Sequence, residues 1–381
     1  MAQLHFNYKD IFRALRLGFS AKKIFMMTLG LTVAMVGYCI MSYIAFLVAG
    51  WSFVDIWSEF RLLPVPEMLP WYSWIIWIIG VLYVLCVILV TGTAISKVTF
   101  EQLKGDDFYQ ISKAFQHSFR NIKAIIFSPT MVILFILSIV ITGLILSLIG
   151  AIPYFGEIFT SIFIIPAFAA SLFIVYLLII FLFTLFFAPA LIGTSGTDTF
   201  DTLFEVFSMV NEQPARLIWY TILTWFLTKV GATLLTIFSR LAVNIGINIL
   251  SVFMGGKIID VVFNAASTFK LTIPYWCPEP CALLAERSIT FLAGSQIFAP
   301  PSYVPSNAAI LIASILTAIA YYILIFFVAG FGLTIWFCGT TASYLVIAKK
   351  KDDRNLLEIK EEPIETAPQA ASSETITESK T

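Results

Sequence analysis

The sequence predicts an all-α polytopic membrane protein with about six transmembrane helices and amphipathic helices at the membrane surface. Composition is the first observation: of 381 residues, 59% are hydrophobic and 12% are charged, and the mean hydropathy is +0.92. The second is that the apolar residues form long runs, and the third is that Lys and Arg gather between some of these runs. Soluble domains are nearer half apolar and a quarter charged, so a bilayer is the solvent that suits this chain.

The apolar runs are long enough to be transmembrane helices, which need about 20 residues. They cover residues 24–50, 71–95, 124–150, 162–190, 217–238 and 308–347. The first run is far longer than the apolar part of a signal peptide, about 7–15 residues, so it is predicted to be a span. The last run exceeds one straight crossing and is expected to tilt or to continue past the interface.

The basic residues predict the orientation of the spans. Lys and Arg are frequent in 1–23, 96–123 and 349–354, whereas 51–70 contains only Arg61 and 151–161 contains none. Because cytoplasmic loops carry the excess of Lys and Arg, the basic segments are predicted to lie inside the cell. Six spans then place both termini in the cytoplasm.

Residues 239–306 allow two interpretations. Leu241–Phe253 is apolar, and charged residues are spaced along the sequence that follows it. The segment is either a large outside insertion with membrane-lying helices, or it contains a seventh span or re-entrant helix. A seventh span would place Lys349–Lys351 outside, against the charge bias, so the outside insertion is favoured.

An internal repeat relates the N-terminus to a later segment. RALRLGFSAKK, Arg13–Lys23, aligns without a gap with KAFQHSFRNIK, Lys113–Lys123, at an offset of 100 residues. Ala14 pairs with Ala114 and Phe19 with Phe119, and each segment is followed at once by an apolar run. The alignment predicts a repeated unit that consists of a surface helix, a span out and a span back.

Both copies have apolar residues at helical spacing on one face and polar residues on the other. Such a helix suits the anionic surface of the cytoplasmic leaflet, to which basic side chains are attracted. The basic residues expected at the membrane surface are Arg13, Arg16, Lys22, Lys23, Lys113, Arg120 and Lys123.

A third and weaker copy begins at Gly196, which pairs with Gly105, as Asp198 pairs with Asp107, and most of its basic residues are lost. The chain is therefore divided into units at 1–100, 101–192 and 193–348, the last with the outside insertion at about 239–306, and a tail at 349–381. The tail is rich in Glu, Ser and Thr and almost free of aromatic residues, so it is expected to be disordered, with partner binding as the alternative.

The second unit resembles a known group of proteins. Its surface helix has an Ala-x-x-x-Ser-Phe core at Ala114–Phe119, and its return span ends in Phe187-Ala188-Pro189. Over roughly residues 100–240 this resembles poorly characterised prokaryotic multi-pass membrane proteins, among them the membrane domain associated with glycerophosphodiester phosphodiesterases and related domains of unknown function. The resemblance implies a prokaryotic cytoplasmic (inner) membrane protein, and it carries over no catalytic residue.

The cysteines divide into two groups. Cys277 and Cys281 lie outside the predicted spans and would face an oxidising compartment, where they could form a disulfide. A zinc site would need more ligands than this side of the membrane offers, and a redox motif would need closer cysteines, so neither is expected. Cys39, Cys86 and Cys338 lie in spans and are predicted to be packing residues.

Lys229 is the one charge that lies well inside a predicted span, which makes it a candidate functional residue. Its partners could be carbonyls, Thr228, Thr233, a lipid phosphate or another subunit, and its side chain could also reach the interface instead. Gly193–Gly196, with the sequence GTSG, resembles the Gly-x-Ser-Gly of rhomboid proteases. Because no predicted span contains the histidine that this chemistry needs, GTSG is interpreted as a turn.

The spans contain no catalytic or nucleotide-binding motif, so a non-enzymatic protein without a cofactor is expected. The leading hypothesis is a scaffold or accessory subunit of a membrane complex, or a protein that organises lipid. The alternative is a small-molecule or lipid transporter with a polar path near Lys229. The expected partners are the lipid bilayer and another membrane protein or a second copy of the chain, and no nucleic acid.

Overall fold

The computed structural model describes residues 6–60, 62–66, 69–266, 307–353 and 355–358. These residues form helices and connecting turns, with no β-strand among them. Six helices are long and apolar enough to cross a membrane: α2 (Ala21–Val48), α4 (Trp71–Lys104), α6 (Ile122–Gly150), α7 (Phe155–Ser195), α9 (Pro214–Met254) and α12 (Ala308–Asp352). The chain is therefore an all-α polytopic membrane protein, as its composition predicts.

Shorter helices separate the long ones. They are the 3₁₀ turn η1 (Tyr8–Asp10), α1 (Arg13–Gly18), α3 (Phe53–Phe60), α5 (Ile111–Arg120), α8 (Thr199–Glu212) and α10 (Gly256–Ala266). A short helix precedes each pair of long helices: α1 before α2 and α4, α5 before α6 and α7, and α8 before α9 and α12. This order is the one expected of a repeated unit.

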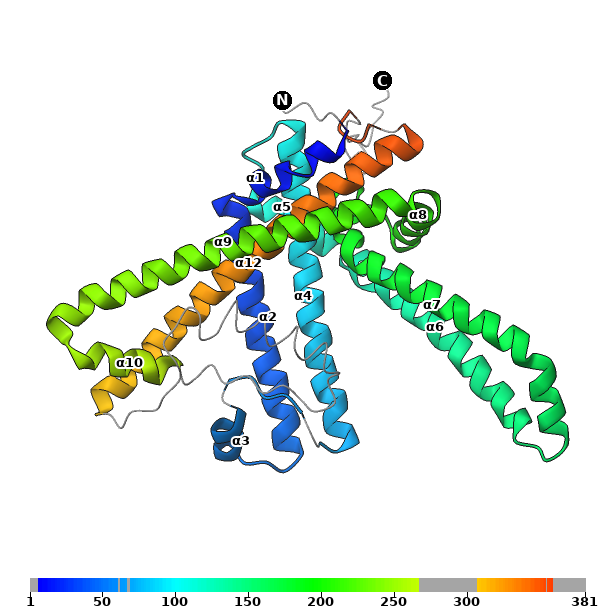
Figure 1. The fold of residues 1–381 in the computed structure, drawn as a ribbon, viewed down its shortest axis with the longest axis horizontal. Helices are drawn as coiled ribbons and strands as arrows, with labels where there is room; N and C mark the ends of the chain where they lie inside the picture. Colours follow the sequence, from blue (N-terminus) through cyan, green and yellow to red (C-terminus); the bar gives the residue numbers. More distant parts are fainter. Residues whose placement is uncertain (1–5, 61, 67–68, 267–306, 354, 359–381) are drawn as a thin grey trace, which may run out of the picture.

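The three hairpins converge at one end and diverge toward the other. Figure 1 shows α1, α5 and α8 at the upper end, with α2 and α4 running down, α6 and α7 running to the lower right, and α9 and α12 running to the left. The upper end, where α1, α5 and α8 lie, is called the convergent end below. The C-terminal end of α12 also lies there, and α12 contacts α1, with Ile335 against Gly18.

The core of the molecule is made by the second helix of each hairpin at the convergent end. Three stretches are buried along their whole length: Leu89–Phe100 of α4, Phe187–Thr194 of α7 and Phe337–Ala348 of α12. These helices contact one another. A helix that is buried on all sides lies inside a bundle, so the return helices form the centre and the first helices surround it.

Glycine allows the central helices to approach closely. A Cβ atom added at Gly193 of α7 would lie 2.9 Å from the carbonyl oxygen of Thr93 and 3.0 Å from the backbone nitrogen of Lys97, both on α4. Backbone atoms cannot move aside as the end of a side chain can. Small residues at such crossings are typical of membrane helices, whose association depends on close packing.

Several positions paired by the repeat alignment have matching environments. Ala14 of α1 and Ala114 of α5 are both fully buried and belong to one apolar cluster with residues of α4 and α12. Phe19 and Phe119 are both exposed, at 74% and 59%. The aligned pair Lys23 and Lys123 differs, since Lys23 is buried and Lys123 is exposed, and the repeat stays a prediction.

The third unit differs from the sequence prediction in its boundaries. Residues 239–254, expected to begin the outside insertion, continue α9 to Met254. The reason is that Leu241–Phe253 is apolar and contains no proline, and a helix that continues keeps its backbone hydrogen bonds in the membrane. The following helix, α10, packs on α12, with Ala266 against Ile325. The question of a seventh span falls on 267–306, outside the described residues.

Candidate functional site

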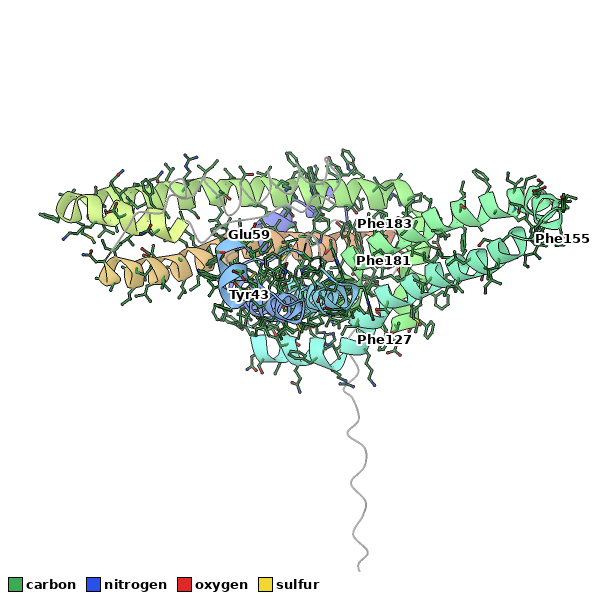
Figure 2. The ribbon with its side chains drawn as sticks, turned by 90° about the horizontal axis from the view of Figure 1, so that it is seen from below. Tyr43, Glu59, Phe127, Phe155, Phe181 and Phe183 are labelled. Atoms are coloured by element: carbon green, nitrogen blue, oxygen red, sulfur yellow. The ribbon has the colours of Figure 1, made fainter. Side chains whose placement is uncertain are left out.

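The most unusual feature of the structure is the hairpin of α6 and α7, which leaves the core. From Ile133 to Tyr176, a range that is described throughout, Gly156 is the only buried residue. These residues are called the arm below. Figure 2 shows the arm extending from the centre, near Phe127 and Phe183, to Phe155 at its far end. The arm therefore presents apolar side chains on almost every side.

The tip of the arm is a tight turn that glycine makes possible. Helix α6 ends at Gly150 and α7 begins at Phe155, and the backbone of Tyr154 has a positive φ of 66°. A Cβ atom at Gly156 would overlap the carbonyl oxygen of Gly150. A residue without a side chain is thus needed at Gly156 for the close approach of the two helices at the tip.

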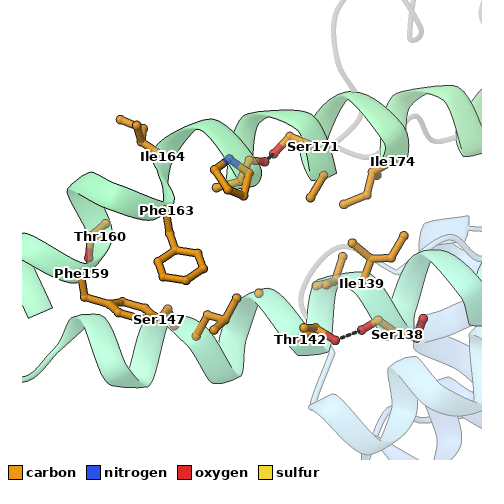
Figure 3. Close-up of a pocket in the computed structure, with 16 residues that line it drawn as sticks. Ser138, Ile139, Thr142, Ser147, Phe159, Thr160, Phe163, Ile164, Ser171 and Ile174 are labelled. Carbon is orange, nitrogen blue, oxygen red and sulfur yellow. Dashed lines mark hydrogen bonds between the residues drawn. The ribbon is translucent and has the colours of Figure 1, made fainter.

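A cleft of about 640 Å³ lies between the two helices of the arm. Figure 3 shows side chains of α6 and α7 facing each other across it. The rings of Phe159 and Phe163, with centroids 4.4 Å apart, lie at the end nearer the tip. The other lining residues are Ser138, Ile139, Val140, Thr142, Gly143, Leu146, Ser147, Thr160, Ile164, Pro166, Ala167, Ala170, Ser171 and Ile174.

The hydroxyl groups of the cleft do not make it polar. Each donates a hydrogen bond of 2.6–2.9 Å to a backbone carbonyl of its own helix: Ser138, Thr142, Ser147, Thr160 and Ser171. The walls are therefore apolar in their chemistry. Between them there is space, because a Cβ atom added at Gly143 would meet nothing within 4 Å.

A second candidate is a group of buried polar side chains at the convergent end. The Lys23 ammonium donates to the carbonyl oxygen of Leu17 at 3.1 Å and to the sulfur of Cys338 at 3.7 Å. The hydroxyl of Thr99 lies 3.2 Å from the same sulfur. These contacts join α1, α2, α4 and α12, and each of them is made between two groups of the protein itself. The arrangement can hold helices together, which is a structural task.

Further polar contacts reinforce the same end. Lys97 and Glu101 form an ion pair of 3.0 Å within α4, and Lys351 at the end of α12 lies 3.1 Å from Glu205 of α8. His117 of α5 is 3.0 Å from the carbonyl oxygen at Ile192 of α7. The sequence interpretation missed the Lys97–Glu101 pair because it ended the span at residue 95. The spacing of four residues between opposite charges was the available signal that the helix continues.

The prediction that Lys23 lies at the membrane surface is wrong. Only 1% of its surface is exposed, whereas it was expected at the membrane surface. It lies in the first turn of α2, which α1 and α12 cover, and its ammonium binds there as described. The remaining basic residues of that prediction are exposed or partly exposed: Arg13, Arg16, Lys22, Lys113, Arg120 and Lys123.

Lys229 lies on the exposed face of α9, and its ammonium is 5.9 Å from the centre of the Trp225 ring. It points away from the buried centre and does not join the polar group around Lys23. The expectation that Gly193–Gly196 forms a turn is met only at its last residue: Gly193, Thr194 and Ser195 continue α7, and Gly196 ends it with a φ of 64°. Cys277 and Cys281 lie outside the described residues, and their disulfide stays a prediction.

Comparisons with known proteins give no family for this chain. It matches no family model, and neither a curated protein nor a solved structure resembles it significantly. The resemblance to the membrane domain associated with glycerophosphodiester phosphodiesterases therefore stays a prediction.

Proposed function

We propose that the protein is a non-enzymatic scaffold of the prokaryotic cytoplasmic membrane, which organises lipid or binds another membrane protein alongside its diverging hairpins. The observation that carries this proposal is the arm, in which one residue of the range 133–176 is buried. In a bilayer such an exposed apolar surface packs against lipid or against the helices of a partner.

The buried polar groups support a structural rather than a chemical role. The ammonium of Lys23 and the hydroxyl of Thr99 are both occupied by contacts to other helices. Lys351 likewise binds Glu205 across two helices. A fixed convergent end and a projecting arm together describe a scaffold, and neither feature calls for a cofactor.

The orientation proposed for this scaffold has both termini in the cytoplasm. Exposed basic residues of the convergent end, such as Lys113, Arg120 and Lys123, suit contact with anionic lipid headgroups. The start of α1 and the end of α12 lie at this same end. The tips of the hairpins then reach toward the outer leaflet.

Photo-crosslinking in native membranes tests the proposal. A photoreactive residue is introduced at Ile165 of the arm, which is 76% exposed, and at Phe25 of α2, which is 61% exposed and serves as the control. The arm position is expected to give a discrete adduct with one protein or one lipid species, identified by mass spectrometry. Equal and heterogeneous labelling of bulk lipid at both positions would contradict a scaffold role for the arm.

A further inference from the structure

The size of the cleft restricts what can occupy it. Its volume of about 640 Å³ falls within the range of small-molecule sites, roughly 300–1,000 Å³. A transmembrane helix about 30 Å long and about 10 Å across has a volume on the order of 2,000 Å³. A partner helix can therefore cover the outside of the arm but cannot enter the cleft. A single hydrocarbon chain can.

The cleft is long enough to hold an acyl chain along the arm. On α6 its lining residues run from Ser138 to Ser147, which at 1.5 Å per residue is a length of roughly 13 Å. On α7 they run from Phe159, one turn after the tip, to Ile174, which is a length of roughly 22 Å. The hydrocarbon core of a bilayer is about 30 Å thick, so the cleft covers roughly half to three quarters of it. An acyl chain that enters beside the tip can follow the cleft along the arm.

The walls favour an apolar occupant. Their hydroxyl groups already donate to carbonyls of their own helices, so none is left to donate to a polar ligand. Gly143, Ala167 and Ala170 are small residues, and their small size leaves space between the helices. An empty space of this size would leave its walls without van der Waals contacts, so a lipid chain is more favourable there than a void.

One charge at the tip indicates the kind of headgroup. Glu157 is the only charged residue in the range 133–176, and it is exposed in the first turn of α7. A lipid whose chain enters the cleft has its headgroup at this end of the arm. An anionic headgroup would meet a carboxylate and no basic residue of the arm. A primary ammonium would be attracted and can also donate hydrogen bonds to the carboxylate, which a quaternary ammonium cannot.

We propose that the cleft binds one acyl chain of an amine-bearing phospholipid, such as phosphatidylethanolamine, with its headgroup beside Glu157. This inference rests on the proposed function and specifies the lipid that the scaffold organises. The arm then acts as a site that selects a lipid by a chain-sized cleft and one acidic group.

Native mass spectrometry of the full chain tests this. The protein is reconstituted in nanodiscs with equal parts of phosphatidylethanolamine, phosphatidylcholine and phosphatidylglycerol, and is then released and stripped of loosely bound lipid. The wild type is expected to retain one lipid, enriched in phosphatidylethanolamine. Gly143→Leu fills the cleft and is expected to lower retention at least tenfold. Gly246→Leu on α9, where an added Cβ also meets nothing within 4 Å, is the matched control and is expected to retain the lipid.

Two further variants complete the test. Ala170→Leu fills the cleft from α7 and is expected to act as Gly143→Leu does, which protects the result against a folding defect in one variant. Glu157→Gln is expected to retain a lipid but to lose the preference for phosphatidylethanolamine over phosphatidylcholine. Unchanged retention in both cleft variants, or a wild type that retains lipids in the proportions of the nanodisc, would overturn the proposal.

The outcome is separable from that of the scaffold proposal. If photo-crosslinking at Ile165 gives a discrete protein partner while the cleft variants retain lipid normally, the scaffold stands and the lipid site fails. If crosslinking gives no discrete product and Gly143→Leu still abolishes lipid retention, the lipid site stands on its own and binding of a protein partner fails.

Discussion

Lys23 shows how a single buried side chain can join several helices of a membrane protein. Its ammonium donates a hydrogen bond to the carbonyl oxygen of Leu17, close to the end of α1, where the last carbonyls of a helix have no partner within it. The sulfur of Cys338 from α12 is its second contact. The charge is therefore kept inside the protein because it satisfies groups that would otherwise be unpaired.

We expect Lys23→Met to lower the free energy of unfolding by about 1–3 kcal/mol, because the variant keeps most of the side-chain volume and leaves the Leu17 carbonyl without its donor. Lys22→Met, at the partly exposed neighbouring residue, is the control and should change the free energy of unfolding by less than about 0.5 kcal/mol. Thermal unfolding in detergent micelles measures both. Equal stabilities for the two variants would show that the buried contacts contribute nothing.

The burial of Lys23 could not be predicted from its sequence neighbours. Its position on the polar face of a basic, amphipathic segment is that of a surface residue. Its contact with Cys338 depends on a helix 315 positions later in the chain. The alignment did pair Ala14 with Ala114, which are buried in one cluster, but it did not indicate which face of each helix packs on the protein.

At the scale of helices, the central crossing of α4 and α7 depends on Gly193. Gly193→Ala is expected to destabilise the protein by about 1–3 kcal/mol, since the new methyl group would press on the backbone of Thr93 and Lys97. Gly246→Ala on α9 meets nothing within 4 Å and is expected to be neutral or to stabilise by up to about 1 kcal/mol through helix propensity. Chemical denaturation of the two variants in the same detergent distinguishes them, and destabilisation of similar size in both would exclude a special role for the crossing.

The existence of the long helices was predictable, and their ends were not. Apolar runs of about 20 residues identify spans with few alternatives. The continuation of α4 to Lys104 and of α9 to Met254 goes beyond the apolar runs that were recognised. In α4 the continuation contains Lys97 and Glu101, which a hydropathy criterion rejects but which pair with each other. The cleft was also beyond prediction, because it depends on how α6 and α7 are placed against each other.

At the scale of the whole molecule, three hairpins share one packed end and separate toward their tips. The packed end contains the buried stretches of α4, α7 and α12 and the polar contacts among them. Among the described residues, the separation leaves the arm exposed along most of its length. Both the scaffold and the lipid site depend on this separation, since an arm packed against the α2–α4 hairpin would have neither a free surface nor an accessible cleft.

The distance between two hairpin tips in a bilayer tests this separation most directly. Spin labels are attached at Ser52→Cys, beyond the end of α2, and at Phe155→Cys, at the tip of the arm, and the distance is measured by pulsed electron paramagnetic resonance in nanodiscs. Helices packed side by side lie about 8–10 Å apart, so tips of packed hairpins would carry labels within about 20 Å. A diverging arm predicts distances clearly above that value. A narrow distribution below about 20 Å would contradict the free arm, and with it the scaffold.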